Sequence, residues 1–564
     1  MTAPPPPPPA RTVADTYLAL LKSRGIDHLF ANAGTDFAPL IEAFAKAGES
    51  GAAVPEPMLV PHENVAVGMA YGYAMVTGRM QAVMVHVGVG TANAVCGLFN
   101  AYKQSIPILF TAGRTPWTEG GVPGGRNNYI NWAQEMFDQA GMVREATKWD
   151  YELRHPAHLE AVVDRALSIA RSEPAGPVYL VLPREVLAAA HDGACRPAAT
   201  QSPTRLGHPG PEAIAEVGRL LYDARRPMLI TADAGRDALA WRALAAFAER
   251  HAVPVVQYRP RVANLPDDHP MHAGYDPAGG LRDADLVLVL DCDVPWIPDV
   301  AGPRADATVV QLGSDPLCAS YPLRGFRSDL SIAANTAAIL TALAEQTPAD
   351  GLGARREWAQ GLRQHVEPAG PEGGMTSAWV SRCIGEASDA DTVLLNEYSL
   401  VLEQLRLDRH GAYFAHSPAG GLGWAMGAAL GVKLARPHAV PIACVGDGTY
   451  MFGNPTPFHF VSRARSLPVV TVIFNNRRWG AVHRATLAMY GDGHAARSSE
   501  PALSVLEPAP EYHRIVEASG GYGEKVVEPQ ELPAALRRAI DAVRVRGLPA
   551  VLNVITEISY SRSS

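Results

Sequence analysis

Short apolar runs alternate with amphipathic stretches along most of the chain. In the first third, the apolar runs include residues 28–31, 82–87, 108–111 and 178–182. Such short runs, each followed by a helical pattern, are typical of strands in a parallel sheet that is covered by helices on both faces. The first third is therefore predicted to form one α/β unit.

The same alternation recurs downstream. We predict strands at 227–231, 253–257, 286–290 and 308–312 in a second unit, and the last unit ends in an apolar run at 550–555. The segments 196–211 and 347–374 are rich in polar residues, Gly and Pro, so we predict that they are linkers.

These patterns predict an α/β fold of three doubly wound parallel-sheet domains. We place the domains at 11–195, 205–346 and 375–564. Residues 1–10 contain six consecutive prolines and are predicted to be a disordered tail. Recruitment of a proline-binding partner is an alternative role for this tail.

Composition narrows the functional class. The 564 residues are too many for a single core, and 47% of them are hydrophobic while 19% are charged. No apolar run is long enough to span a bilayer, and the tail lacks the features of a signal peptide. A net charge of −8 gives no basic footprint for nucleic acid. The six cysteines form no Cys-x-x-Cys pair, so we expect reduced thiols in a cytoplasmic protein.

Two polar motifs follow neighbouring apolar runs in the last unit. Gly446-Asp447-Gly448 comes directly after the predicted strand 442–445, and Asn475-Asn476 comes directly after the predicted strand 469–474, with a helix predicted at 458–466. Parallel strands would place the carboxylate and the carboxamide side by side. Mg²⁺ takes such oxygen ligands together with substrate phosphates, which glycines allow the backbone to approach. The sequence therefore predicts a magnesium–diphosphate site.

This pattern resembles the signature of thiamine diphosphate-dependent enzymes, and the resemblance extends over essentially the whole chain. It implies that Asp447 and Asn476 bind Mg²⁺ through their side chains and that Arg478 does so through its carbonyl group. The spacer is slightly long for the family, so Asn475 is an alternative to Asn476. The residues expected at the diphosphate are Gly446, Gly448 and Thr449.

Glu63 matches the glutamate of this family that hydrogen-bonds the aminopyrimidine ring of the cofactor and activates it. It lies in Pro61-His62-Glu63-Asn64, where a helix is predicted to begin. The alternative is that Glu63 is an ordinary first-turn acid, stabilised by the helix dipole.

Two further segments match cofactor contacts of the family. In the stretch 419–424, Leu422 matches the apolar side chain that bends the cofactor, and the Gly420 carbonyl, beside Gly421, matches the acceptor for its amino group. Asn396 and Ser399 resemble a motif that touches the diphosphate, although Leu400 departs from it.

The substrate-side residues carry mixed resemblances. Thr35 and His86 match positions of benzoylformate decarboxylases that face the substrate and carry protons, whereas Gln134 resembles a residue of acetolactate synthases. His86 is as well explained as a core histidine. His269 and His272 resemble a loop that approaches the site, but surface turn positions are the favoured interpretation.

The resemblance implies cleavage or formation of a C–C bond beside a carbonyl group, with thiamine diphosphate and Mg²⁺ as cofactors. We expect decarboxylation of a 2-oxo acid with transfer to a carbonyl acceptor, as in acetolactate synthases. The alternatives are simple decarboxylation, as in benzoylformate decarboxylases, and a non-catalytic homologue.

A nicotinamide enzyme is disfavoured, because residues 30–34 lack the Gly-rich fingerprint. FAD binding is open but unsupported. The family also implies a homodimer or homotetramer with active sites shared between subunits, and neither nucleic acid nor membrane as a partner.

Overall fold

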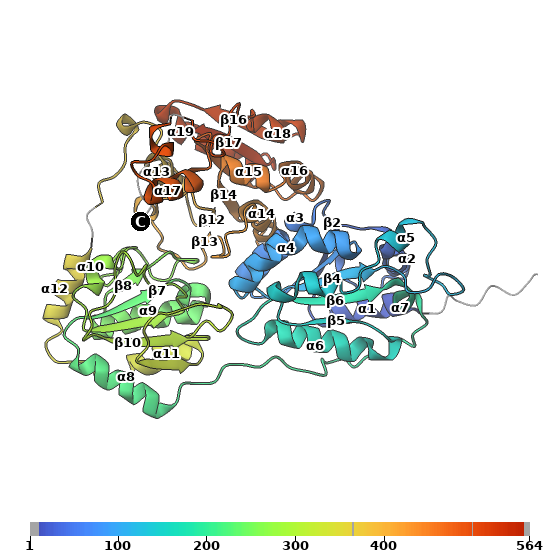
Figure 1. The fold of residues 1–564 in the computed structure, drawn as a ribbon, viewed down its shortest axis with the longest axis horizontal. Coiled ribbons are helices and arrows are strands. Elements are labelled where there is room, and N and C mark those ends of the chain that lie inside the picture. The colour runs from blue at the N-terminus through green and yellow to red at the C-terminus, as the bar shows by residue number, and fades with distance from the viewer. Residues whose placement is uncertain (1–10, 364–365, 499, 558–564) are drawn as a thin grey trace, which may run out of the picture. The chain divides into compact units, whose positions relative to one another are not determined.

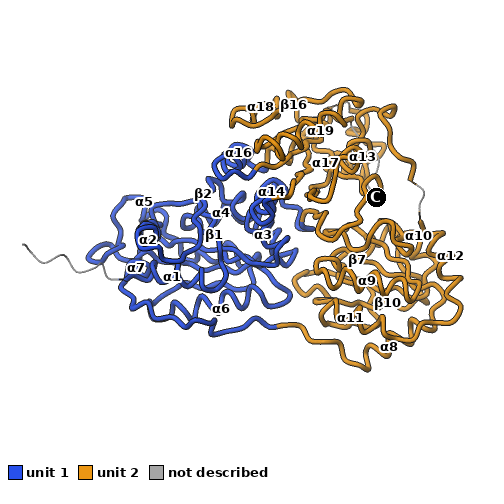
Figure 2. The backbone as a smooth tube through the Cα atoms, turned by 180° about the vertical axis from the view of Figure 1, so that it is seen from behind, with its two compact units in different colours: residues 1–204, 417–437, 453–467 blue, residues 205–416, 438–452, 468–564 orange. Residues whose placement is uncertain are grey.

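The computed structural model describes residues 11–363, 366–498 and 500–557, so the predicted tail at 1–10 lies outside it. Its contacts divide the chain into two compact units. Figure 2 shows these units, which consist of residues 1–204, 417–437 and 453–467, and of residues 205–416, 438–452 and 468–564.

The first unit contains one six-stranded parallel sheet in the order β2-β1-β3-β4-β6-β5. Its strands are β1 (His28–Ala31), β2 (Glu56–Leu59), β3 (Ala82–Val85), β4 (Leu109–Arg114), β5 (Asp150–Glu152) and β6 (Val178–Pro183). Its helices are α1 (Val13–Ser23), α2 (Ala38–Ser50), α3 (Glu63–Thr77), α4 (Val87–Lys103), α5 (Ile130–Ala133), α6 (Leu159–Arg171), α7 (Arg184–Ala188), α14 (Trp424–Ala435) and α16 (Pro455–Ala464).

The second unit contains two parallel sheets, of five and six strands (Figure 1). The five-stranded sheet has the order β11-β10-β9-β7-β8, and its strands are β7 (Pro227–Thr231), β8 (Val255–Gln257), β9 (Leu286–Leu290), β10 (Thr308–Gly313) and β11 (Leu330–Ala333). The six-stranded sheet has the order β13-β12-β14-β15-β17-β16, and its strands are β12 (Thr392–Asn396), β13 (Tyr413–Ala415), β14 (Val440–Gly446), β15 (Val470–Asn475), β16 (Tyr522–Val526) and β17 (Ala550–Ile555).

The helices of this unit surround both sheets. They are α8 (Pro211–Asp223), α9 (Ala238–His251), α10 (Ala278–Leu281), α11 (Thr336–Ala344), α12 (Gly353–Leu362), α13 (Ser377–Ala387), α15 (Asp447–Phe452), α17 (Gly480–Met489), α18 (His513–Ala518) and α19 (Leu532–Arg544).

Alternating strand residues build the core on the two faces of each sheet. In the first unit, Leu29, Leu109 and Leu180 pack with α1, α2 and α6, while the intervening strand residues face α3 and α4. Burial on both faces explains why the strands are apolar throughout. The prediction of three parallel-sheet α/β domains is confirmed; the predicted domain boundaries stay predictions.

Two sequence predictions of local structure were wrong. The strand expected at 82–87 ends at Val85, because His86 stands at the N-cap position of helix α4, which begins at Val87. The segment 347–374, expected to be a linker, contains helix α12, whose Arg355 is buried and donates to the carbonyl oxygens of Leu221 and His251 at 2.6 and 3.1 Å.

Helices α3 and α14 cross at unusually close range within the first unit. A Cβ atom on Gly72 of α3 would lie 2.1 Å from the carbonyl oxygen of Ala428, and one on Gly431 of α14 would lie 2.1 Å from that of Met69. Only glycine permits such backbone contact. The crossing joins two helices whose first turns lie beside predicted cofactor residues, Glu63 and Leu422.

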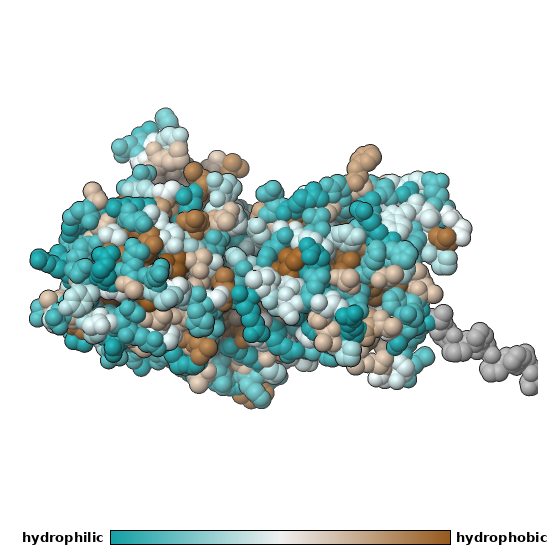
Figure 3. All heavy atoms as spheres, turned by 90° about the horizontal axis from the view of Figure 1, so that it is seen from below, coloured by the Kyte–Doolittle hydropathy of each residue, from teal (hydrophilic) through white to brown (hydrophobic). Residues whose placement is uncertain are grey.

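The surface carries no large apolar belt on the face shown in Figure 3, where hydrophobic residues are scattered among hydrophilic ones. None of the helices in the described ranges is both long and apolar enough to cross a bilayer. All six cysteines are free thiols.

Candidate active site

Glu63 is the first residue of α3 and is only 4% exposed. Its two carboxylate oxygens accept hydrogen bonds from the side-chain amides of Asn32 (2.9 Å) and Asn93 (3.2 Å). Gly90 lies against the same carboxylate, since a Cβ there would be 3.1 Å from Oε1. The carboxylate is therefore fixed in one orientation and is partly desolvated, more than an ordinary first-turn acid requires.

His86 stands between two polar side chains at the end of β3. Its Nδ1 is 2.5 Å from Asp36 Oδ1, and its Nε2 is 3.1 Å from the amide nitrogen of Gln134. The hydrogen bond to Asp36 raises the pKa of His86 above its usual value; burial opposes this, and the charges of Asp36 and Glu63 add to it. The structure thus joins His86 and Gln134, two of the predicted substrate-side residues.

Thr35 is exposed and directly precedes Asp36 in the turn after β1. Its carbonyl oxygen accepts a hydrogen bond from Arg184 at 3.3 Å. The neighbour of Gln134, Glu135, is neutralised by Arg114 and Arg126 at 2.7 and 2.6 Å. These ion pairs hold the segment that carries Gln134.

The turn that contains Gly420, Gly421 and Leu422 is fastened to α4 in the first unit. Asn100 donates to the Gly421 carbonyl at 2.8 Å and accepts from the Gly421 N–H at 3.0 Å. Gly420 has a φ of 71°, which favours glycine. This double hydrogen bond fixes the backbone on which the side chain of Leu422 stands.

The predicted metal residues lie at the carboxyl ends of two central strands of the six-stranded sheet in the second unit. Strands β14 and β15 are paired, so Asp447 and Asn476 follow neighbouring strand ends. Asp447 is 2% exposed, and its Oδ2 has no hydrogen-bond partner in the described part of the chain. Burial raises the pKa of this carboxyl to about 6, against the lowering effect of the N–H groups of Gly448, Arg477 and Arg478.

A buried carboxylate with an unused oxygen fits a hard cation at this position. The described residues contain no cluster of three or more His, Cys, Asp or Glu side chains that could hold a metal ion by themselves. A cation held by Asp447 would therefore need further oxygen ligands, such as those of a diphosphate.

The two asparagines after β15 differ in what their amides already do. Asn475 is 1% exposed; its nitrogen donates to Asn553 at 3.0 Å and its oxygen accepts from Arg477 N–H at 3.2 Å. Asn476 is half-buried, and the one hydrogen bond found for its side chain within the described ranges is from the Arg478 N–H to its oxygen at 3.0 Å. Asn476 is therefore the better placed of the two to offer an oxygen to a cation.

Asn396 and Ser399 build the turn after β12. The Asn396 oxygen accepts from the N–H groups of Ser399 and Leu400, both at 3.0 Å, and its nitrogen donates to Tyr413 at 3.0 Å. Asn396 shapes this turn with all its polar atoms, so a diphosphate contact would come from the turn's backbone or from Ser399.

Gly448 and Thr449 lie in the first turn of α15. The ring of Trp479 covers Gly448, and a Cβ there would be 2.5 Å from it. Thr449 is buried. A Cβ on Gly446, the last residue of β14, would have its nearest contact at 3.8 Å, with the Thr449 hydroxyl oxygen.

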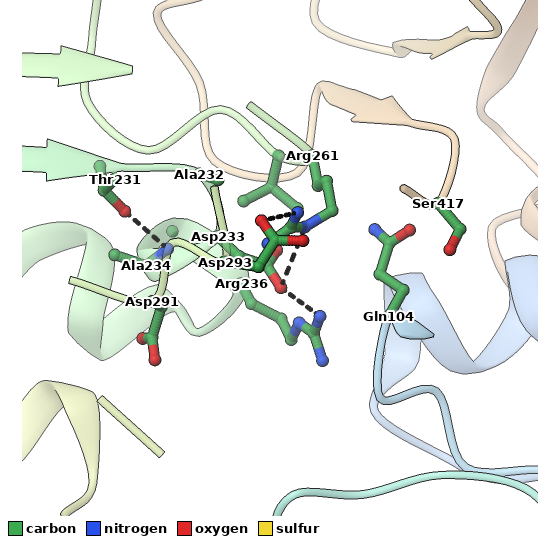
Figure 4. A network of polar contacts seen from close by, with 12 residues as sticks. Gln104, Thr231, Ala232, Asp233, Ala234, Arg236, Arg261, Asp291, Asp293 and Ser417 are labelled. Atoms are coloured by element: carbon green, nitrogen blue, oxygen red, sulfur yellow. Dashed lines mark hydrogen bonds and ion pairs between the residues drawn. The ribbon is translucent and has the colours of Figure 1, made fainter. Parts of the chain in front are cut away.

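The five-stranded sheet has its topological switch point between β7 and β9, where dinucleotides bind in folds of this kind. Figure 4 shows Arg261 between Asp233 and Asp293 at these strand ends. The Arg261–Asp293 distance is 2.8 Å, and Asp233 also pairs with Arg236. Two carboxylates and the arginine that pairs with them therefore lie at the switch point of this sheet.

His272 corrects one expectation, because it is buried and not a surface turn residue. It lines a cavity of about 220 Å³ with Asp267, Tyr275 and Arg363. Burial lowers its pKa to about 4. His269 is half-buried, and its Nδ1 accepts a hydrogen bond from the N–H of Met271 at 3.1 Å.

Sequence reasoning missed several residues that organise these sites, chiefly Asp36, Asn32, Asn93 and Asn100. Asn32 and Asp36 belong to the turn that was compared for Thr35, and a carboxylate so close to a buried strand end was the available signal. Asn93 and Asn100 each stand three residues after a glycine of α4, a pattern that carries no signal before the fold is known.

Three family models match the chain. They are the N-terminal binding domain (residues 11–142), the central domain (214–343) and the C-terminal binding domain (397–554) of the thiamine pyrophosphate enzymes.

Full-length relatives have several activities. The acetolactate synthase isozyme 3 large subunit of Escherichia coli K12 is 24% identical, over 94% of this chain and 92% of that protein. Benzoylformate decarboxylase of Pseudomonas aeruginosa is 26% identical over 97% and 99%. Sulfoacetaldehyde acetyltransferase of Castellaniella defragrans is 25% identical over 94% and 91%.

Solved structures share the fold. A benzoylformate decarboxylase from Polynucleobacter necessarius superimposes with a TM-score of 0.81 at 21% identity, covering 97% of this chain and 99% of that one. A thiamine diphosphate-dependent 4-hydroxybenzoylformate decarboxylase from Rhodococcus jostii gives 0.79 at 21% identity, covering 98% and 100%.

Proposed function

The chain belongs to the thiamine pyrophosphate enzyme family, and from this membership we propose that it uses thiamine diphosphate and Mg²⁺ to decarboxylate a 2-oxo acid. Thiamine diphosphate, when bound, supplies the carbon nucleophile that adds to the keto group and the electron sink for the pair released with CO₂. The protein supplies binding, orientation and proton transfer.

The observation that carries the proposal is the buried Glu63 carboxylate, held by two amides at the start of α3. A carboxylate fixed in this way suits a lasting hydrogen bond to a ring nitrogen of the cofactor. Asp447 and Asn476 would hold Mg²⁺ together with the carbonyl group of Arg478. The diphosphate would be bordered by Gly446, Gly448 and Thr449. Leu422 would shape the cofactor beside the Gly420 carbonyl.

Two outcomes can follow decarboxylation. Proton delivery to the reacting carbon gives an aldehyde, and a role for His86 in that step is supported by its hydrogen bond to a buried carboxylate, which raises the pKa of His86. Transfer to a second carbonyl compound gives an acyloin, and the amide of Gln134 supports that outcome because it lies beside His86 and could orient an acceptor. We propose decarboxylation as the common step and the acyloin as the second candidate product.

FAD forms no part of this proposal. We further propose that the active unit is a homodimer or homotetramer, as the family resemblance implies.

The test is to incubate the purified protein, thiamine diphosphate and Mg²⁺ with pyruvate and with benzoylformate, and to measure CO₂, aldehyde and acyloin separately. CO₂ with aldehyde supports simple decarboxylation, and CO₂ with acyloin supports transfer. A panel of 2-oxo acids that releases no CO₂ would contradict the proposal and favour the non-catalytic homologue.

A further inference from the structure

Asp36 carries a buried carboxylate that has no role in the proposed reaction. It is 3% exposed, its Oδ1 contacts Nδ1 of His86, and its Oδ2 accepts the N–H of Val87 at 3.3 Å. A surface ion pair would leave at least one carboxylate oxygen in water. Here both oxygens point at the segment that begins α4.

Two glycines make the space for this carboxylate–imidazole pair. A Cβ on Gly113, in β4, would lie 1.7 Å from Asp36 Oδ2, and a Cβ on Gly34 would lie 2.1 Å from Nδ1 of His86. Any larger residue at either position would displace one partner. The glycine backbone at Gly34 and Gly113 therefore leaves the space in which Asp36 and His86 can stay in contact.

We propose that Asp36 is a positioning residue for the reaction, holding the Nδ1–H of His86 so that Nε2 is the nitrogen that gives a proton to the reacting carbon. This inference rests on the proposed function. A carboxylate on one imidazole nitrogen fixes the tautomer and the ring orientation, which leaves the other nitrogen for chemistry.

The charged groups around His86 favour its protonated form. Asp36 comes from the turn after β1 and Glu63 from α3, and both raise the pKa of His86. Glu135, beside Gln134, is already paired with Arg114 and Arg126.

The proton balance is simple. Loss of CO₂ leaves an electron pair on the former keto carbon, a C–H bond forms as the Nε2–H bond breaks, and His86 becomes neutral with its Nδ1–H still directed at Asp36. Solvent then returns a proton to Nε2. The carboxamide of Gln134 can hydrogen-bond His86 in both protonation states. Its oxygen accepts from Nε2–H, and after a 180° flip its nitrogen donates to the unprotonated Nε2.

The direct test is the titration midpoint of His86, measured by NMR on protein with labelled histidine and assigned with His86→Gln. We expect Asp36→Asn to shift the midpoint to lower pH. Gly113→Ala should do the same without removing any titratable group, because the methyl group displaces the Asp36 carboxylate. Gly48→Ala is the matched control, since a Cβ there meets nothing within 4 Å. An unchanged midpoint in folded Asp36→Asn or Gly113→Ala protein would overturn the inference.

Turnover separates this inference from the proposed function. Aldehyde formation needs the proton, whereas 2,6-dichlorophenolindophenol can instead take the electron pair, after which water releases the carboxylic acid. We expect Asp36→Asn to lose aldehyde formation about 100-fold, to keep dye reduction within a few-fold, and to shift the alkaline limb of its aldehyde pH profile to lower pH. Wild-type protein that neither releases CO₂ nor reduces the dye contradicts the proposed function. A wild-type pH profile in an active Asp36→Asn variant contradicts the role of Asp36 alone.

Discussion

Gly72→Ala tests whether the close crossing of α3 and α14 is a structural requirement. The added Cβ would lie 2.1 Å from the Ala428 carbonyl oxygen and 2.7 Å from its carbonyl carbon. An ordinary C···O contact is about 3.3 Å, so the helices would have to separate by roughly 1 Å. The obstacle is backbone, which cannot rotate away as a side chain can.

The expected cost follows from two opposing effects. Overpacking costs about 1–3 kcal/mol, and replacing glycine inside a helix returns about 0.5–1 kcal/mol. Because the obstacle is backbone, we take the upper end of the overpacking cost, which leaves a net loss of about 2 kcal/mol. At about 2–4 °C per kcal/mol for a domain of this size, Tm should fall by about 4–8 °C.

Thermal unfolding followed by circular dichroism measures this effect, with Gly48→Ala as the control for glycine replacement in an exposed helix. Gly48→Ala should leave Tm unchanged or raise it slightly. Because Glu63 and Leu422 lie where these two helices begin, Gly72→Ala should also weaken binding of thiamine diphosphate. A Tm for Gly72→Ala equal to that of Gly48→Ala would refute the reasoning.

Three other predictions concern buried charges. Arg261→Ala should lower the free energy of unfolding by about 3–5 kcal/mol in urea titrations, since it leaves Asp233 and Asp293 without their shared partner; a loss below 1 kcal/mol would contradict this. His272 has a folded pKa of about 4, below its unfolded value of 6.5, so the unfolded chain binds the extra proton between these pH values and stability falls as pH decreases from 6.5 to 4. His272→Gln should reduce that slope, and an unchanged slope would exclude His272 as its source. Asp447→Asn should raise the stability of the cofactor-free protein by up to roughly 3 kcal/mol and abolish the rise in Tm caused by thiamine diphosphate with Mg²⁺; a preserved rise would contradict its role as a metal ligand.

Much of the fold could be predicted from the sequence because parallel strands are buried on both faces. The runs at 28–31, 227–231, 286–290 and 550–555 became strands with the expected bounds. The errors occurred where one residue decides the element. His86 follows β3 as the N-cap residue of α4, and Arg355 ties a polar, glycine-containing segment to buried carbonyl groups.

The candidate site was predictable where a motif is contiguous and less so where side chains meet across the fold. Glu63 and Asp447 stand in short local patterns, and the structure buries both carboxylates. Asp36 lies 50 residues from His86 in sequence, and only the pairing of β1 with β3 brings the two together. The preference for transfer rested on Gln134, whose amide the structure places against His86.

The central claim is that Glu63 activates thiamine diphosphate for C–C bond chemistry. The most direct measurement compares Glu63→Gln with wild type for cofactor affinity, by fluorescence quenching, and for CO₂ release from the best 2-oxo acid at saturating cofactor. The exposed Glu42→Gln on α2 is the matched control. We predict that Glu63→Gln binds thiamine diphosphate within a few-fold of wild type and loses about 100-fold or more of its turnover, while Glu42→Gln behaves as wild type. Turnover near the wild-type rate in cofactor-saturated Glu63→Gln protein would contradict the account.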